Sequence, residues 1–204
     1  MKFIKWKILI ITSLFCIAPI ILGLALWERL PETIAIHFDI NGKPDNFASR
    51  GFVVFGVPLI MAAFQALSCF IHDIEAKRHG EKKKFEKVVK WIIPAMTVAI
   101  YVATLGFGLG WNIDMRTVAV FIVGVMFIAM GNYLPKLDYV KNYKLSTENA
   151  RKINRFCGFT MVIMGALMLI SLFFPPVVSV FCLLLLIPCI IITVIYSVIT
   201  ARKK

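Results

Sequence analysis

The sequence predicts an all-α integral membrane protein with six transmembrane helices. Its 204 residues are 60% hydrophobic and have a mean hydropathy of +0.85, whereas a water-facing domain of this size carries a more polar surface. The apolar residues form runs of about 20 residues, the length that a helix needs to cross a hydrocarbon layer about 30 Å thick. No run contains Asp, Glu, Lys or Arg, although an amphipathic helix of a soluble protein would show them on its wet face. The six runs cover residues 8–27, 52–71, 91–111, 118–134, 156–174 and 177–199.

The first run has a second interpretation, a cleaved signal peptide. Lys2, Lys5 and Lys7 precede the run, and basic residues precede both kinds of segment. The run is longer than the roughly 7–15 apolar residues of a signal peptide, and Gly23 and Ala25 form only a weak cleavage signal. We therefore predict a membrane span, with a signal peptide as the alternative.

The basic residues predict the topology. Nineteen of the 23 Lys and Arg residues fall before the first run, between the second and third, between the fourth and fifth, and after the sixth. The positive-inside rule places these segments, and with them both termini, in the cytoplasm. The net charge of +12 would otherwise suggest a nucleic-acid partner. Here it is explained by topology and by anionic lipid headgroups, so the expected partner is the lipid bilayer and not nucleic acid.

This topology leaves residues 28–51 as the one long segment outside the cytoplasm. We expect an N-terminal domain over residues 1–75, made of two spans and this loop, and a C-terminal domain of four spans over residues 76–204. The inner segment 72–90 mixes charges of both signs at helical spacing and is expected to be a solvated extension of the second or third span, with a break near Gly80.

The spans themselves indicate little chemistry. Their lack of ionisable residues argues against a secondary transporter, because such proteins place charges inside the membrane. All five cysteines lie within or at the ends of the runs, so we expect no structural disulfide in the outer loop.

The outer loop is the candidate site. Residues 33–38 alternate and are β-prone, and Asn41-Gly42 is a turn dipeptide, so the loop is expected to be ordered. An imidazole with two nearby carboxylates could ligate a cation, act as a titratable pair or hydrogen-bond the turn. We assign the loop to ligand binding, with no metal, through His37, Asp39, Asn41, Gly42, Asp45 and Ser49.

Enzymatic activity is not expected. No Ser or Cys nucleophile lies beside a base in the sequence, and the zinc-protease motif H-E-x-x-H is absent. No cofactor is implied. A metal-dependent activity at the outer face, in which His37 would take part, stays open as an alternative.

A second motif ends the fourth run. Gly131-Asn132-Tyr133-Leu134-Pro135-Lys136 is turn-prone and lies at the inner face, where Tyr133 suits the membrane interface. Ser146 or Thr147 can then cap the helix that becomes the fifth span.

The two motifs together resemble the SdpI-like membrane proteins, immunity factors against a secreted sporulation-delaying peptide toxin. Residues 30–50 read Leu-Pro-x-x-Ile-x-x-His-Phe-x-x-x-Gly-x-x-Asp-x-x-x-Ser-Arg, which is similar to the opening domain of that family. The inner motif is similar to the family's Gly-Asn-(Tyr/Phe)-(Met/Leu)-Pro-Lys turn, and the resemblance covers the six-span plan.

The resemblance implies a multi-pass protein of the bacterial cytoplasmic membrane that protects a cell from a peptide toxin. In some members immunity is coupled to signalling, because the protein holds a transcriptional repressor at the membrane. The family's Arg-Thr-Pro-Trp-type stretch after the inner motif is replaced here by Asn142-Tyr143-Lys144-Leu145-Ser146, which weighs against a cytoplasmic repressor as partner. The alternatives from other classes are a small transporter and a sensor of an envelope signal.

Overall fold

The structure is a computed structural model that describes residues 4–39, 41–79, 83–136 and 146–202. Within these residues, six helical segments are long and apolar enough to cross a membrane, which confirms the predicted fold class. The replacement at residues 142–145 lies outside the described residues. The candidate spans are Trp6–Ala25, Phe52–Lys77, Glu86–Gly108, Met115–Lys136, Glu148–Ser171 and Pro176–Arg202.

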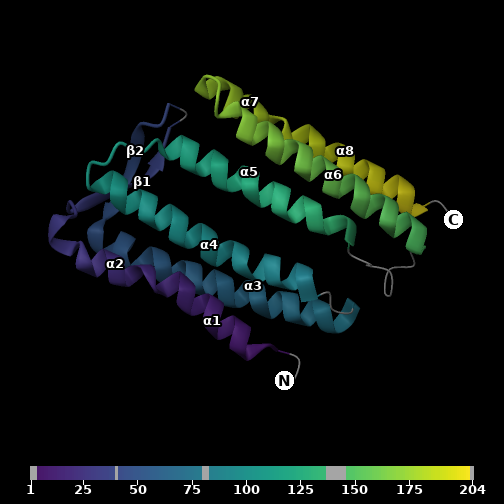
Figure 1. Cartoon of the computed structure of the whole chain (residues 1–204), viewed down its shortest axis with the longest axis horizontal. Helices are drawn as coiled ribbons and strands as arrows, with labels where there is room; N and C mark the ends of the chain where they lie inside the picture. The colour runs from purple at the N-terminus through teal and green to yellow at the C-terminus, as the bar shows by residue number, and fades with distance from the viewer. Residues whose placement is uncertain (1–3, 40, 80–82, 137–145, 203–204) are drawn as a thin grey trace. The chain divides into compact units, whose positions relative to one another are not determined.

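Prolines and short irregular turns set the bounds of the helices. Pro19 opens α2, Pro176 opens α7, and Pro94 lies inside α4. The side chain of Ser146 accepts the backbone N–H of Asn149 at 3.1 Å, which confirms Ser146 as the cap of α6. The helices are α1 (Trp6–Ile17), α2 (Pro19–Ala25), α3 (Val57–His79), α4 (Lys83–Gly108), α5 (Met115–Tyr133), α6 (Thr147–Ser171), α7 (Pro176–Leu184) and α8 (Leu186–Arg202) (Figure 1).

The chain forms two compact units. The first contains Met1–Ile74 and Val89–Ala119, and the second contains Glu75–Val88 and Val120–Lys204. Helices α3, α4 and α5 therefore each begin in one unit and end in the other. The domain boundary after residue 75 stays a prediction, since compact units need not coincide with domains.

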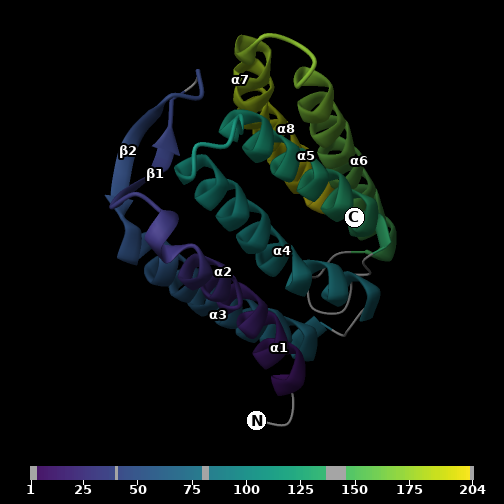
Figure 2. The ribbon, with the colours of Figure 1, turned by 60° about the vertical axis from the view of Figure 1, so that its left-hand side comes forward.

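In the first unit, a β-hairpin closes one end of the helices α2, α3 and α4 (Figure 2). Strands β1 (Thr33–Phe38) and β2 (Pro44–Ser49) pair antiparallel, with an irregularity in register around His37. Ile34 is 1% exposed and joins a core made by both the hairpin and the helices below it. The loop is thus ordered, as its alternating pattern predicts. This core contains Leu30, Ile34, Val53, Val54, Tyr101 and Leu105.

In the second unit, α5 and α6 approach each other at two pairs of glycines. A Cβ atom built on Gly131 would lie 2.6 Å from the carbonyl oxygen of Gly158. One built on Gly165 would lie 2.6 Å from the carbonyl oxygen of Gly124. Small residues of this kind let helix backbones approach closely in membranes. Helices α7 and α8 then pack against α6.

Candidate functional site

The tip of the hairpin is a turn built around Asp39. Its Oδ1 accepts the backbone N–H groups of Asn41 at 2.9 Å and Lys43 at 2.8 Å. Gly42 has a φ of +78°, a left-handed conformation that favours glycine, and its N–H donates to the Asp39 carbonyl at 2.9 Å. Three of the six predicted site residues, Asp39, Asn41 and Gly42, therefore build the turn.

These hydrogen bonds make the turn sensitive to acid. The backbone N–H of Lys43 lowers the pKa of Asp39 from its ordinary value of 3.8; desolvation opposes this effect, and the backbone N–H of Asn41 adds to it. Because the folded pKa is lowered, the ionised carboxylate stabilises the turn fully above pH 3.8, and this contribution is lost as the pH falls through the lowered pKa. We expect the protection factors of the Asn41 and Lys43 amides, which are corrected for the intrinsic pH dependence of exchange, to fall below about pH 4. Hydrogen exchange measured by NMR tests this, and Asp39→Asn should make these protection factors low and independent of pH in this range.

His37 and Asp45 form the exposed part of the site. His37 Nδ1 lies 2.5 Å from Asp45 Oδ1 across the two strands, and the side chains are 67% and 47% exposed. The pair is thus open to a ligand on the face of the hairpin. Asp39 is used by the turn instead of joining this pair, and among the described residues no three His, Cys, Asp or Glu side chains gather as metal ligands do.

Ser49 and Arg50 fix the hairpin to the helices. The Ser49 hydroxyl accepts the N–H of Phe52 at 3.3 Å, at the start of the π-helical turn Phe52–Gly56. Arg50 Nη1 donates to the carbonyls of Trp27 at 2.6 Å and Leu30 at 3.1 Å, and its guanidinium lies 4.5 Å from the Trp27 ring centroid. Such charge-assisted bonds and ring contacts hold the hairpin in place. Arg50 was not among the predicted site residues, although it is the last residue of the outer-loop motif that spans residues 30–50.

A groove lies beside strand β1 in the same unit. It has a volume of about 140 Å³. Its lining is mainly apolar, with hydroxyl groups from α4 on one side. The lining residues are Ile36, Val53, Val57, Met61, Thr97, Ile100, Tyr101 and Thr104.

At the other end of the first unit lies a buried ion pair that the sequence interpretation missed. Lys90 Nζ lies 2.5 Å from Asp73 Oδ1, and each side chain is 1% exposed. Asp73 Oδ2 also accepts the backbone N–H of Lys5 at 3.0 Å. The predicted helical extension of the spans exists, because α3 and α4 continue beyond the apolar runs. The prediction that this extension is solvated is wrong for Asp73, Glu86 and Lys90, which are buried.

Gln65 extends this polar cluster. Its Nε2 lies 2.8 Å from the Lys90 carbonyl oxygen, 2.8 Å from Thr12 Oγ1 and 3.1 Å from Cys69 Sγ, three acceptors that share its two N–H donors. In a regular helix the Lys90 carbonyl would accept the N–H of residue 94, but Pro94 has none. Gln65 thus satisfies a carbonyl that the proline leaves without its helical partner. The Gln65 Oε1 atom is buried and has no partner in the described part of the chain.

A helical pattern could have revealed the cluster. Gln65, Cys69 and Asp73 are spaced four residues apart, so they share one face of α3. Glu86 and Lys90 have the same spacing on α4, and both are buried. If the helical pattern is continued past the first charged residue of each apolar run, these residues fall on the face of the helix that packs against its neighbours.

The inner motif forms the end of α5 and its contact with α6. Gly131 lies at the glycine crossing, and a Cβ atom on Gly158 would contact the ring of Pro135 at 2.7 Å. Lys136 Nζ lies 4.9 Å from the Tyr133 ring centroid, while the Asn132 side chain is exposed. The close contact between α5 and α6 accounts for the glycine at position 131 and for the position of Pro135 beside Gly158. A binding role for Gly131, Asn132, Tyr133, Pro135 and Lys136 stays a prediction.

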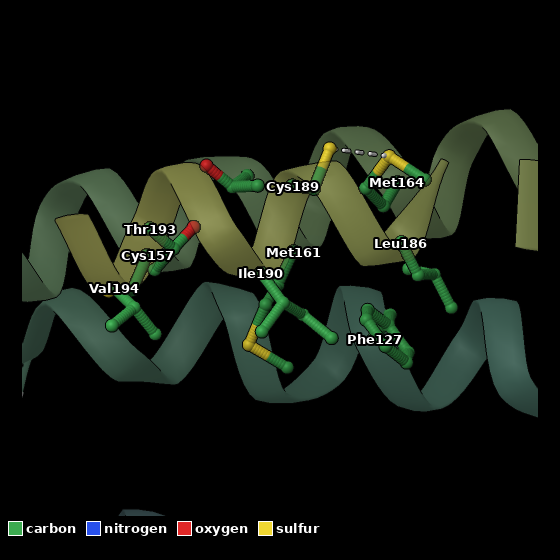
Figure 3. Close-up of a pocket in the computed structure, with 10 residues that line it drawn as sticks. Phe127, Cys157, Met161, Met164, Leu186, Cys189, Ile190, Thr193 and Val194 are labelled. Carbon is green, nitrogen blue, oxygen red and sulfur yellow. Dashed lines mark hydrogen bonds between the residues drawn. The ribbon is translucent and has the colours of Figure 1, made fainter. Parts of the chain in front are cut away.

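The second unit also holds an apolar cavity of about 290 Å³ between α5, α6 and α8 (Figure 3). Phe127, Met161 and Ile190 reach into it from the three helices. Cys189 Sγ lies 3.6 Å from Met164 Sδ in its wall. The sequence carried no signal for this cavity, because its lining residues are ordinary ones for a membrane span.

A family model described as a domain of unknown function, DUF1648, matches residues 14–62. This region runs from α1 through the hairpin into α3 and so contains the six residues predicted to bind a ligand in the outer loop. SdpI-like proteins are known to carry such a domain. No curated protein matches the chain. No solved structure matches it either.

Proposed function

We propose that the protein is an immunity protein that binds a secreted peptide toxin at the outer face of the bacterial cytoplasmic membrane. Both termini lie in the cytoplasm in this proposal, as the distribution of Lys and Arg favours, and the hairpin faces outward. The DUF1648 match and the two sequence motifs support the likeness to SdpI-like proteins.

The observation that carries the proposal is the exposed His37–Asp45 pair on a hairpin that is fixed to the membrane helices. A fixed element loses little conformational freedom when it binds, so more of the contact energy appears as affinity. Asp45 offers a carboxylate to a cationic or amide group of a peptide. The neighbouring groove offers apolar surface to a hydrophobic side chain, since Ile36 of strand β1 is 43% exposed at its wall.

Protection of a toxin-sensitive host tests the proposal. Cells that express the protein should survive the sporulation-delaying peptide. The double variant His37→Ala/Asp45→Asn should lower the highest toxin concentration that the cells survive by at least about tenfold, as loss of a charge-assisted contact does. Glu32→Gln is the matched control. Glu32 is an exposed carboxylate in the same segment, so its replacement removes the same charge from another position.

The protein level in the membrane must be equal in all strains. Full protection by the His37→Ala/Asp45→Asn variant would contradict the proposal, and so would equal loss of protection in Glu32→Gln. The second result would show that general negative charge, rather than the pair, matters.

The second candidate is an envelope-signal sensor, which the buried Asp73–Lys90 pair favours. Ionisable residues inside membrane helices are costly, and they usually have a functional role. A sensor would respond to a ligand without moving it across vesicles, whereas a transporter would move it.

A further inference from the structure

Two side chains of helix α3 contact Lys90 of helix α4. Asp73 pairs with its ammonium at 2.5 Å, and the Gln65 amide donates to its carbonyl at 2.8 Å. We call Gln65, Asp73 and Lys90 the clamp. All three side chains are buried, so water does not compete for these contacts.

The clamp lies one helical turn before Pro94. A proline inside a helix removes one backbone hydrogen bond and is a common site of bending. The first part of α4 is therefore joined to the rest by a weakened turn, and the Gln65 amide replaces the missing bond from another helix. Without the clamp, Pro94 is the place at which α4 would bend.

The clamp also lies where the chain passes between its two compact units. The first unit ends at Ile74 and resumes at Val89, so Asp73 and Lys90 are each within one residue of a crossing. The intervening segment carries most of the charge between the second and third spans.

We propose that the clamp is a two-state latch, whose opening lets the first part of α4 bend at Pro94. A buried ion pair adds little stability compared with apolar residues of the same size, whereas it specifies one arrangement. The closed state also leaves the Oε1 atom of Gln65 buried without a partner among the described residues, a cost that water entry would relieve. The closed state is thus held by specific pairs and not by packing alone. This inference does not depend on the identity of any ligand.

Two cysteines of the same unit make the latch measurable. Cys69 and Cys16 are both 0% exposed, but only Cys69 contacts the clamp, through Gln65 at 3.1 Å. Opening should expose Cys69 and leave Cys16 protected, whereas unfolding should expose both. The background for the test replaces Cys157, Cys182 and Cys189 by Ala.

The experiment measures the labelling rates of both thiols by a small charged methanethiosulfonate reagent in open membrane fragments. Asp73→Asn should raise the Cys69 rate at least tenfold and change the Cys16 rate less than twofold. Gln65→Leu, a second variant that leaves the ion pair intact, should raise the Cys69 rate at least threefold. The apolar double variant Asp73→Leu/Lys90→Met should label no faster than the parent.

Three results would overturn the proposal. The first is a Cys69 rate that stays within twofold of the parent in both Asp73→Asn and Gln65→Leu. The second is a parallel rise at Cys16, which would mean loss of the fold. The third is a double variant that labels as fast as Asp73→Asn, because a loss of packing would then explain the exposure.

Discussion

Asp73→Asn should lower the free energy of unfolding by about 3–5 kcal/mol, the usual cost of removing one partner from a buried ion pair. Lys90 would keep its ammonium in a site that is 1% exposed, with an amide in place of the carboxylate. Lys90→Met should cost a similar amount, because Asp73 would then be the uncompensated charge. Denaturant unfolding of the purified protein in mixed micelles measures both changes.

The double variant Asp73→Leu/Lys90→Met is the control for this prediction. Apolar residues of similar volume often replace a buried ion pair with little loss of stability, so the double variant should unfold within about 1 kcal/mol of the parent. If the effects of the two single variants simply added in the double variant, the pair would contribute through two independent contacts. The account of a mutually compensated pair would then be wrong.

Gly131→Ala should destabilise the second unit by about 1–3 kcal/mol, as overpacking of a tight contact does. The added Cβ atom would lie 2.6 Å from the Gly158 carbonyl oxygen, which belongs to the backbone and cannot rotate away. Helices α5 and α6 would therefore have to separate at this crossing. The same unfolding measurement detects the change.

Gly108→Ala is the matched control, since its nearest neighbour, the Ile34 side chain, would be 3.5 Å from the new Cβ atom. This is an ordinary contact distance, so its stability should stay within about 0.5 kcal/mol of the parent. An equal loss in both variants would show that the effect comes from the substitution of glycine in a helix and not from the helix crossing.

Patterns local in sequence predicted the spans and the hairpin. The apolar runs give the six helices because a backbone in hydrocarbon must satisfy its own hydrogen bonds. Alternation over Thr33–Phe38 and the Asn41-Gly42 dipeptide indicate the strand and the turn, which the structure contains. These features depend on residues that are neighbours along the chain.

Helical spacing could have shown which helix faces carry the clamp residues, but local patterns could not predict the pairing of Asp73 with Lys90 or the Arg50 anchor. Asp73 and Lys90 meet across two helices, and the partners of Arg50 are backbone carbonyls 20 and 23 residues earlier. The mixed charges of residues 72–90 indicated a solvated segment, because the sequence does not show which of these side chains form pairs in the folded protein. The role of His37 and Asp45 was inferred from their clustering, and the structure adds that the two side chains are in contact.

Direct binding tests the central claim, that the His37–Asp45 face of the hairpin receives a peptide toxin. The measurement is the affinity of the fluorescently labelled sporulation-delaying peptide for the protein in lipid nanodiscs, with empty nanodiscs to correct for binding to lipid. We expect saturable binding by the parent and by Glu32→Gln, and an affinity at least about tenfold weaker for Asp45→Asn, equivalent to about 1.4 kcal/mol. Binding no stronger than to empty nanodiscs, or equal affinities of the parent and Asp45→Asn, would contradict the claim.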